Sequence, residues 1–382
     1  MPNAPSRTMD AYKMYEAATT DAEKSRYLEE YISCIPKHKG TEHERGMLKK
    51  KLALLRENIE KKAKGAGGAQ EINVRKQGAA QIVFAGFPNA GKSSLLRAIT
   101  NSDAKVASYA FTTISPNVGM LDVHDVSIQL VDLPGLISGA ADNKGMGKRF
   151  LTVMRNSDVI AFFLAMDDHP LDRLDRLMHE FDAAGIRLNQ EKPDIKIYKK
   201  GCGGINLLGE HLLRFEKAEA LETCRQFGIL NADIRINRSI GFEDFVDALD
   251  KSTVWKKAFV ILNKTDVAKL EDAKRVVKLI KMRYNLPTIP ISIKAGENLE
   301  KLKETIWAIC GLMRIYTSTS PNSEPIVMPN GSTIIEAAVK IHKDFAEKFK
   351  FAKVWGKSVK YPGQRVGKDH LLVDGDIIEL NA

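Results

Sequence analysis

The chain has 382 residues, 44% of them hydrophobic and 28% charged, and a formal net charge of +10 at pH 7. This composition excludes a disordered chain, and the length allows two or three packed domains. No apolar run approaches the roughly 18–20 residues that a membrane-spanning helix needs, so we expect no membrane partner. The positive charge favours a polyanion such as RNA as a partner, although lysine-rich solvated surfaces are also common.

The compartment is predicted from the amino-terminal stretch and the cysteines. The first residues contain no apolar signal-peptide core, so we expect no export. The four cysteines, Cys34, Cys202, Cys224 and Cys310, are widely scattered and show no CxxC or metal-ligand spacing. We interpret them as reduced thiols of a cytoplasmic protein.

Two helices are predicted near the amino terminus, over residues 9–33 and 41–64, with a turn between them. In the second helix, apolar residues recur at three- and four-residue steps and the other faces are basic. The basic face could bind rRNA, or it could be an ordinary solvated surface. The glycine-rich stretch 65–69 is typical of a flexible hinge. Residues 1–66 are therefore predicted to form a helical hairpin and its linker.

Short, continuous apolar runs then alternate with helical stretches. The runs cover residues 82–87, 127–133, 159–165, 258–263 and 288–293. Continuous apolar strands are buried on both faces, which predicts an α/β domain with a mostly parallel sheet and helices on each side. We place this domain at 80–317.

One gap between these strands is longer than a crossover helix requires. About 90 residues separate the third run from the fourth, and residues 169–186 can supply the crossover helix. The remaining residues, 187–240, are predicted to form a small inserted α+β subdomain. After a Ser- and Pro-rich linker, residues 324–382 have the β-rich pattern of a compact β-grasp domain.

The stretch GFPNAGKSS matches a P-loop, with an apolar strand before it and a helix after it. Glycines such as Gly86 and Gly91 let backbone N–H groups converge on phosphate oxygens at a helix amino terminus. Lys92 can reach the β- and γ-phosphates, and the Ser93 hydroxyl can ligate Mg²⁺.

A second motif, Asp-Leu-Pro-Gly, follows a buried strand. Asp132 can hold Mg²⁺ through a water, and Gly135 can donate its backbone N–H to the γ-phosphate. Thr113, between the two motifs, can complete the Mg²⁺ shell with its hydroxyl.

The motif Asn-Lys-Thr-Asp at the end of a further buried strand predicts the base. The Asp266 carboxylate can accept hydrogen bonds from both N1–H and N2–H₂ of guanine, a pair that adenine does not present. The nucleotide is therefore predicted to be GTP. Where GTPases commonly carry Ser-Ala-Lys, this chain has Ser292-Ile293-Lys294, and the base contact at Ile293 is a backbone N–H.

The predicted nucleotide site combines these motifs. Its residues are Gly86, Phe87, Pro88, Asn89, Ala90, Gly91, Lys92, Ser93, Ser94, Phe111, Thr112, Thr113, Asp132, Leu133, Pro134, Gly135, Asn263, Lys264, Thr265, Asp266, Ser292, Ile293 and Lys294.

The residue after the Asp-x-x-Gly motif bears on hydrolysis. In Ras-type GTPases a glutamine there orients the attacking water, but here the residue is Leu136. One hypothesis is a bound K⁺ that replaces an arginine finger, with Asn89 as its side-chain ligand. The residues with predicted catalytic roles are then Lys92, Thr113, Gly135 and Asn89. The alternative is a site that binds GTP with negligible turnover.

Nearly the whole chain from about residue 36 resembles the developmentally regulated GTP-binding proteins, in the Obg branch of translation-factor-like GTPases. The matching stretches are GFPNAGKSSLL, YAFTTISPNVGML, DLPGLISGAADNKGMGKRFL, FDAAGIRLNQ, KKGCGGINL, NADIRI, ILNKTD, MRIYT and KFKFAKVWGKSVKYPGQRVGKDH. The resemblance implies a helix-turn-helix hairpin, an S5-domain-2-like insert and a carboxy-terminal TGS domain. It also implies association with ribosomes, slow K⁺-responsive GTP turnover and, in eukaryotes, dedicated partner proteins.

A basic stretch with aromatic residues lies near the carboxy terminus. The candidates for ribosome or RNA contact are Lys353, Lys357, Lys360, Arg365 and Lys368. Phe351, Trp355 and Tyr361 lie among them and could stack on unpaired bases, or Phe351 and Trp355 could belong to the domain core. Lys199-Lys200-Gly201-Cys202-Gly203-Gly204 is a further candidate RNA or partner loop, or a solvated turn.

The sequence thus predicts a cytoplasmic regulatory GTPase that binds GTP and GDP with Mg²⁺ and acts with ribosomes, rRNA or tRNA in translation. The alternatives are a GTP-sensing RNA- or ribosome-binding module and a ribosome-assembly factor of the Obg type. The glycine-rich amino-terminal domain of Obg proteins is absent, which argues against the assembly factor. No feature predicts sequence-specific reading of DNA.

Overall fold

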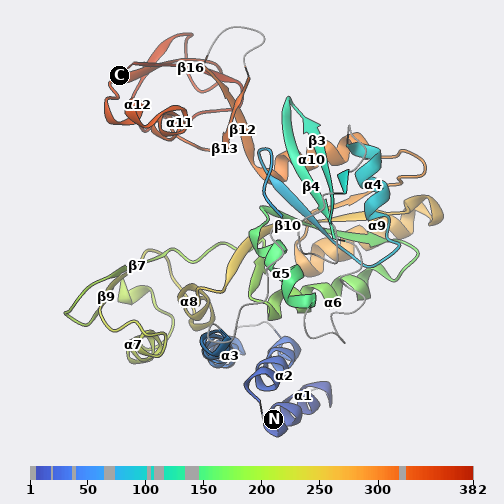
Figure 1. Cartoon of the computed structure of the whole chain (residues 1–382), viewed down its shortest axis with the longest axis vertical. Coiled ribbons are helices and arrows are strands. Elements are labelled where there is room, and N and C mark those ends of the chain that lie inside the picture. Colours follow the sequence, from blue (N-terminus) through green and yellow to red (C-terminus); the bar gives the residue numbers. More distant parts are fainter. Residues whose placement is uncertain are drawn as a thin grey trace. The chain divides into compact units, whose positions relative to one another are not determined.

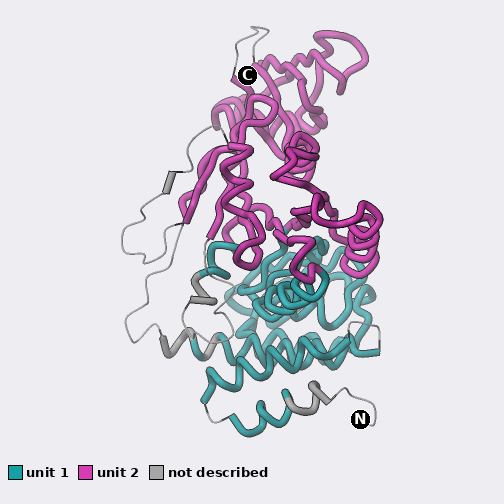
Figure 2. Tube along the Cα trace, turned by 90° about the vertical axis from the view of Figure 1, so that its right-hand side faces the viewer, with its two compact units in different colours: residues 1–73, 144–155, 171–256 teal, residues 74–143, 156–170, 257–382 magenta. Residues whose placement is uncertain are grey.

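The computed structural model describes residues 6–18, 20–36, 40–63, 74–100, 105–106, 116–133, 146–317 and 324–381. The chain forms two compact units, which Figure 2 distinguishes by colour. Unit 1 comprises residues 1–73, 144–155 and 171–256, and unit 2 comprises residues 74–143, 156–170 and 257–382. Among the described residues, no helix is both long and apolar enough to cross a membrane.

The central sheet has eight strands, of which seven follow the order β11-β10-β5-β1-β4-β3-β2 and the eighth, β6, pairs with β10 (Figure 1). Strands β1, β4, β5, β10 and β11 pair in parallel, which confirms the predicted mostly parallel sheet. The bounds are β1 Gln81–Ala85, β2 Lys105–Val106, β3 Asn117–Val123, β4 Val126–Asp132, β5 Val159–Ala165, β6 Ile186–Leu188, β10 Val254–Asn263 and β11 Thr288–Pro290.

Every residue of β1 and β5 is buried, as the continuous apolar runs predict. On one face of the sheet, α4 (Lys92–Ile99) and α10 (Leu299–Cys310) share a core with the strands through Leu95, Leu96 and Ile306. A further helix, α9 (Leu270–Tyr284), buries Ala273 and Ile280. Because β1, β4, β5, β10 and β11 run parallel, their carboxyl ends lie at a common edge of the sheet, where the predicted motifs follow them.

Three strands of this sheet, β2, β3 and β6, were not predicted. β3 pairs antiparallel with β4 and β2 pairs antiparallel with β3. The hairpin between β3 and β4 turns at His124 and Asp125, which both have positive φ, 52° and 61°. That turn matches the twist of a tight hairpin. Because β3 mixes buried, half-buried and exposed residues, it lacks the continuous apolar run of its neighbours.

The described residues of the amino-terminal region form three helices: α1 (Ser6–Ala17), α2 (Asp21–Cys34) and α3 (Glu42–Ala63). The prediction of one helix over 9–33 is wrong, because a capping box starts a new helix at Thr20. The Thr20 side chain accepts a hydrogen bond from the backbone N–H of Glu23, and the Glu23 side chain accepts one from the backbone N–H of Thr20. The predicted second helix corresponds to α3.

The insert in unit 1 has a three-stranded sheet of order β7-β9-β8. Its elements are β7 Ile195–Lys199, β8 Ile205–Leu208, η1 Glu210–Leu212, α7 Lys217–Gln226 and β9 Ala232–Ile236. Its core also includes Phe245 and Leu249 of α8 (Phe242–Leu249), so it extends beyond the predicted limit at residue 240. The preceding helix, α6 (Pro170–Ala183), corresponds to the predicted crossover helix.

The carboxy-terminal domain has a five-stranded mixed sheet of order β13-β12-β16-β14-β15. Its elements are β12 Leu312–Tyr316, β13 Ile326–Pro329, α11 Ile334–Ile341, α12 Lys343–Glu347, β14 Phe351–Trp355, β15 Gln364–Val366 and β16 Asp376–Asn381. β12 belongs to this sheet because it pairs with β13 and β16. The sheet therefore begins before residue 324, on the other side of the Ser- and Pro-rich linker.

Candidate nucleotide site

The loop between β1 and α4 has the backbone geometry of a phosphate cradle. Gly91 caps α4 with a φ of 104°, in the left-handed region that favours glycine. A Cβ atom at Gly86 would collide with the carbonyl oxygen of Phe163, and one at Gly91 would collide with the Asn263 side chain. The positions that the motif assigns to glycine thus have no room for a side chain.

Lys92 is held inside this loop. Its Nζ donates hydrogen bonds to the carbonyl oxygens of Gly86 and Phe87, both at 2.8 Å, and the side chain is only 8% exposed. Burial lowers the pKa of Lys92, and the charge of Asp132 opposes that shift. The loop carbonyls therefore hold the ammonium group at the start of α4.

Ser93 and Asp132 meet at the end of β4. The Ser93 hydroxyl donates to Asp132 Oδ2 at 2.5 Å. Asp132 is 1% exposed, and its other oxygen, Oδ1, is buried with no hydrogen-bond partner among the described residues. A hydroxyl and an unpaired carboxylate oxygen are hard oxygen donors of the kind that Mg²⁺ prefers. These two residues therefore fit a Mg²⁺ ion.

Asn263, at the end of β10, connects the phosphate loop to the predicted base-binding segment. Its Nδ2 donates to the carbonyl oxygen of Ala90 at 2.9 Å, and its Oδ1 accepts from the Ile293 backbone N–H at 3.4 Å. The side chain is 4% exposed, and its two hydrogen bonds connect the two loops in the protein interior. The sequence assigned Asn263 to the site without predicting this bridging role.

Asp266 lies in η2 (Thr265–Val267), directly after β10. The Ser292 hydroxyl donates to Asp266 Oδ1 at 2.6 Å, and the same hydroxyl accepts from the Ala295 backbone N–H at 3.0 Å. The hydrogen bond from Ser292 is the largest cause that holds the pKa of Asp266 below its usual value, against a smaller opposing effect of burial. Asp266 is thus an oriented anion, as guanine recognition requires.

Two neighbours fix the rest of this motif. Lys264 has a φ of 60°, and its Nζ forms an ion pair with Asp167 Oδ2 at 2.7 Å. The Thr265 hydroxyl donates to the carbonyl oxygen of Ile291 at 2.9 Å. Sequence reasoning missed Asp167, although its place just after the strand over 159–165 puts it at the same sheet edge.

The remaining predicted residues differ in how far the structure describes them. Leu133 is 4% exposed, whereas Pro88, Asn89, Ser94 and Lys294 are exposed. Those that lie outside the described residues are Phe111, Thr112, Thr113, Pro134 and Gly135, together with Leu136.

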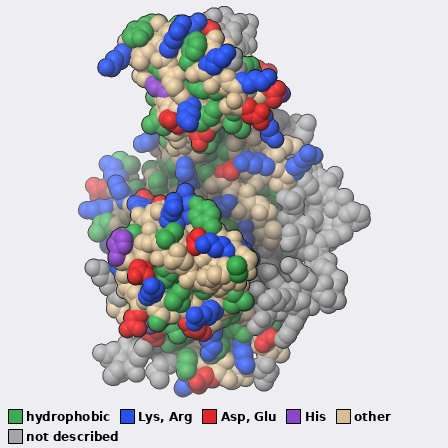
Figure 3. All heavy atoms as spheres, turned by 90° about the vertical axis from the view of Figure 1, so that its left-hand side faces the viewer, with side chains coloured by type: hydrophobic (Ala, Val, Ile, Leu, Met, Phe, Trp, Pro, Cys, Tyr) green, Lys and Arg blue, Asp and Glu red, His purple; other side chains and the backbone are tan. Residues whose placement is uncertain are grey.

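The basic candidates in the carboxy-terminal domain lie on its surface, and Figure 3 shows Lys and Arg side chains over the visible part of this domain, at the top of the view. Lys357, Lys360 and Lys368 are exposed. Lys353 forms an ion pair with Glu379 at 3.2 Å, and the guanidinium carbon of Arg365 lies 4.6 Å from the centroid of the Phe351 ring.

Phe351 and Trp355 do not form the core of this domain. On β14 they are half-buried and alternate with Ala352 and Val354, which are fully buried. The core alternative for the two rings is therefore wrong, and both belong to the outer face of the sheet.

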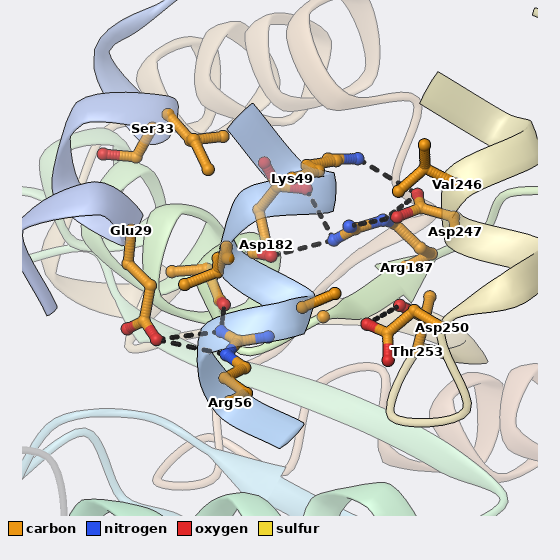
Figure 4. A pocket seen from close by; sticks show the side chains of 15 residues that line it. Glu29, Ser33, Lys49, Arg56, Asp182, Arg187, Val246, Asp247, Asp250 and Thr253 are labelled. Carbon is orange, nitrogen blue, oxygen red and sulfur yellow. Dashed lines mark hydrogen bonds and ion pairs between the residues drawn. The ribbon is translucent and has the colours of Figure 1, made fainter. Parts of the chain in front are cut away.

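A pocket in unit 1 is lined by charged side chains and includes none of the predicted nucleotide residues (Figure 4). Lys49, Arg187 and Asp247 meet there through ion pairs of 2.7–3.0 Å. The charges of these side chains are paired with one another, so we interpret the pocket as part of a buried ion-pair network that supports the fold.

Comparison with known proteins agrees with these features. Residues 81–200 match a family model described as 50S ribosome-binding GTPase, residues 202–312 match the C-terminal region of that domain, and residues 313–382 match the TGS domain. The fold and these matches define the chain as a P-loop GTPase with a carboxy-terminal TGS domain.

Relatives identify the family within that class. A GTP-binding protein of Methanocaldococcus jannaschii is 39% identical over 94% of this chain and 92% of its own length. Developmentally-regulated GTP-binding protein 1 of Xenopus laevis is 36% identical over 92% of this chain and 96% of its own length. The chain therefore belongs to the developmentally regulated GTP-binding protein family, as its motifs predicted.

Among solved structures, the YchF GTPase of Schizosaccharomyces pombe aligns with a TM-score of 0.48 and 17% identity, over 82% of this chain and all of that chain. The family assignment rests on the sequence relatives.

Proposed function

We propose that this protein is a regulatory GTPase that binds GTP with Mg²⁺, hydrolyses it slowly with stimulation by K⁺, and acts on ribosomes or RNA in the cytoplasm. The observation that carries the proposal is the Ser93–Asp132 pair at the phosphate loop, with its unpaired buried carboxylate oxygen. Asp266, oriented by Ser292, supports guanine as the base.

The chain's own residues suit the phosphoryl transfer. Lys92 can exchange its two carbonyl partners for phosphate oxygens without leaving the loop, because an ammonium group donates in any direction. Ser93 and Asp132 would hold Mg²⁺, which neutralises charge on the phosphates when bound. Thr113 and Gly135 complete this proposed set, with roles carried over from the motif alone.

Asn89 is the residue that we propose as the side-chain ligand for K⁺. It is exposed at the crest of the phosphate loop with a φ of 62°, and its amide oxygen is the kind of hard donor that a monovalent cation takes. Since Leu136 cannot polarise a water, stimulation by a cation would compensate for the missing glutamine.

We expect GTP turnover to be at least about tenfold faster in KCl than in NaCl, and we expect Asn89→Ala to remove most of that difference. The reason is that a bound cation would replace an arginine finger, which accelerates hydrolysis by ~10³–10⁵. Steady-state phosphate release in matched salts measures both effects. The control is Lys274→Ala, an exposed residue of α9 outside the predicted nucleotide site. Equal turnover in KCl and NaCl contradicts the cation hypothesis, and stimulation that survives Asn89→Ala removes Asn89 as the ligand.

A second candidate function is a GTP sensor with negligible turnover. Leu136 is the observation that favours it, because a leucine side chain at that position cannot orient the attacking water. The two functions differ in single-turnover experiments with ribosomes present. A rate no faster than that of free GTP, in either salt, would favour the sensor.

We propose that the TGS domain contacts ribosomal RNA or tRNA. We also propose that the protein binds a dedicated partner protein. The family model that matches residues 81–200 is described as a ribosome-binding GTPase, and in the TGS domain the exposed cations Lys357 and Lys360 supply the charge. We expect Lys357→Glu with Lys360→Glu to weaken ribosome co-sedimentation roughly tenfold at physiological salt, because cation–phosphate contacts dominate such affinities. Unchanged co-sedimentation would place the contact elsewhere.

A further inference from the structure

The three-stranded sheet of the insert has one covered face and one open face. Toward the core, Ile197, Ile234 and Leu207 lie in one row and join a hydrophobic cluster with α7 and α8. The alternate residues point away from that core. They are Lys196 and Tyr198 on β7, Asp233 and Arg235 on β9, and Asn206 and Leu208 on β8.

The strand register sets two cations side by side on this open face. Lys196 on β7 lies directly opposite Arg235 on β9, and both side chains are exposed. Like charges at directly opposed positions destabilise a sheet. Neither residue has an ion-pair partner in the part of the chain that the structure describes. Folding alone therefore gives no reason for this pair.

The acidic residue on the face does not neutralise these cations. Asp233 forms an ion pair with Lys200 at 2.5 Å, so its charge is already balanced from the following loop. The row of Lys196 and Arg235 thus keeps its positive charge for an external anion.

Large exposed side chains flank the two cations. Tyr198, two residues from Lys196 on the same face, is 51% exposed, and Leu208, opposite Arg235, is 39% exposed. Asn206 completes the second row, opposite Asp233.

The loop that joins β7 to β8 allows a close approach at the edge of the face. Gly201 has no positive φ, and no atom lies within 4 Å of where its Cβ would be. The backbone at Gly201 is therefore open to an approaching ligand.

We propose that the open face of β7-β9-β8 binds RNA, with Lys196 and Arg235 on consecutive phosphates and Tyr198 stacked on an unpaired base. Cations supply salt-dependent affinity, and an exposed aromatic ring supplies stacking, the combination typical of single-stranded RNA binding. An acidic peptide would also match the cations, and it is the alternative that the test below distinguishes. The proposal rests on the RNA part of the proposed function and adds a second contact region to it.

Fluorescence anisotropy with a labelled single-stranded RNA oligonucleotide and the full chain tests the face. We expect Lys196→Ala with Arg235→Ala to weaken binding roughly tenfold or more and to reduce the magnitude of the slope of log K against log salt by about 1.4, since each lost phosphate contact removes ~0.7. Tyr198→Leu should weaken binding about tenfold with an unchanged slope, whereas Tyr198→Phe should retain it. The matched control is Lys274→Ala with Lys278→Ala, two exposed cations on α9.

The outcomes separate this proposal from the proposed function. The two-alanine variant removes like-charge repulsion, so its melting temperature should equal or exceed that of wild type. Suppose that wild type binds the RNA and that the TGS charge-reversal variant binds it more weakly. If the insert variant then binds as well as wild type, only the insert proposal is overturned. If wild type binds no RNA, the RNA part of the proposed function fails as well. Binding of poly-glutamate is measured in the same way. If Lys196→Ala with Arg235→Ala weakens binding of poly-glutamate more than binding of RNA, the face belongs to an acidic protein partner and the proposal is overturned.

Discussion

Replacing Asp266 by Asn should lower the affinity for GTP by about 10²–10⁴-fold, because two hydrogen bonds to a charged acceptor are lost or inverted. The carboxylate can accept from both N1–H and N2–H₂ of guanine, whereas an amide presents one acceptor and one donor. The donor then faces the N2 amino group, and two donors in contact repel. Competition between a fluorescent GTP analogue and unlabelled nucleotides measures the change in affinity.

The same substitution should raise the affinity for xanthosine triphosphate. Xanthine carries a carbonyl oxygen in place of the N2 amino group, so the Asn amide N–H can donate to it while the amide oxygen accepts N1–H. A gain for the xanthine nucleotide together with a loss for GTP shows that the fold and the phosphate loop are intact. A protein that had simply unfolded would lose both.

Ser292→Ala provides a graded control. The Ser292 hydroxyl donates to Asp266 Oδ1 at 2.6 Å and accepts from the Ala295 N–H, so its removal releases the carboxylate without changing its charge. We expect a smaller loss of GTP affinity than for Asp266→Asn, and no gain for xanthosine triphosphate. Undiminished preference for GTP over ATP in Asp266→Asn would show that another group reads the base.

The candidate site could be proposed from the sequence because its motifs follow buried parallel strands. Asp132 ends β4 and Asn263 ends β10, and parallel strands bring such ends to one edge. The bridge from Asn263 to Ala90 could not be predicted, because it joins residues 173 apart whose approach depends on sheet order.

The wrong boundaries have local causes. The break before α2 had a visible signal, Thr-x-x-Glu at Thr20 and Glu23, but the surrounding helical periodicity outweighed it. β12 was placed with the GTPase core because the Ser- and Pro-rich linker follows it rather than precedes it. The placement of Phe351 and Trp355 was also not predictable from the sequence. The alternation along β14 separates two faces of the strand, but the sequence does not indicate which face packs on the domain core.

Substituting Arg45 should cause the largest loss of stability in unit 1. Arg45 is 1% exposed and donates to the carbonyl oxygens of Ile32 and Ile35, both at 2.8 Å. It also forms ion pairs with Asp182 at 3.2 Å and Glu243 at 3.3 Å. Arg45→Met leaves the two carbonyl oxygens without their donor, at about 1–3 kcal/mol each, and removes one cation from each carboxylate, although Lys49 still pairs with Glu243 and Arg187 with Asp182.

A matched control separates burial from charge. Lys217 pairs with Glu210 in the same unit, but both side chains are half exposed. Breaking that pair with Lys217→Met should cost less than about 1 kcal/mol, as exposed ion pairs do. Because a chain with several domains need not unfold in one step, hydrogen exchange of peptides from α3 and α8 is the appropriate measurement. Equal protection of these peptides in the two variants would contradict the prediction.

Acidification should reproduce the loss through a neighbouring carboxylate. Burial alone raises the pKa of Asp247, but hydrogen bonds and charges from Arg187 and Lys49 outweigh it and hold the pKa below its usual value (Figure 4). A carboxylate with a lowered pKa in the folded state stabilises the protein above its unfolded pKa of about 3.9, and that stability disappears as the pH falls through the folded value. Protection of α8 should therefore decrease below about pH 4, and Asp247→Asn should flatten this dependence. A pH profile of α8 protection that is unchanged in Asp247→Asn would assign the acid sensitivity to other carboxylates.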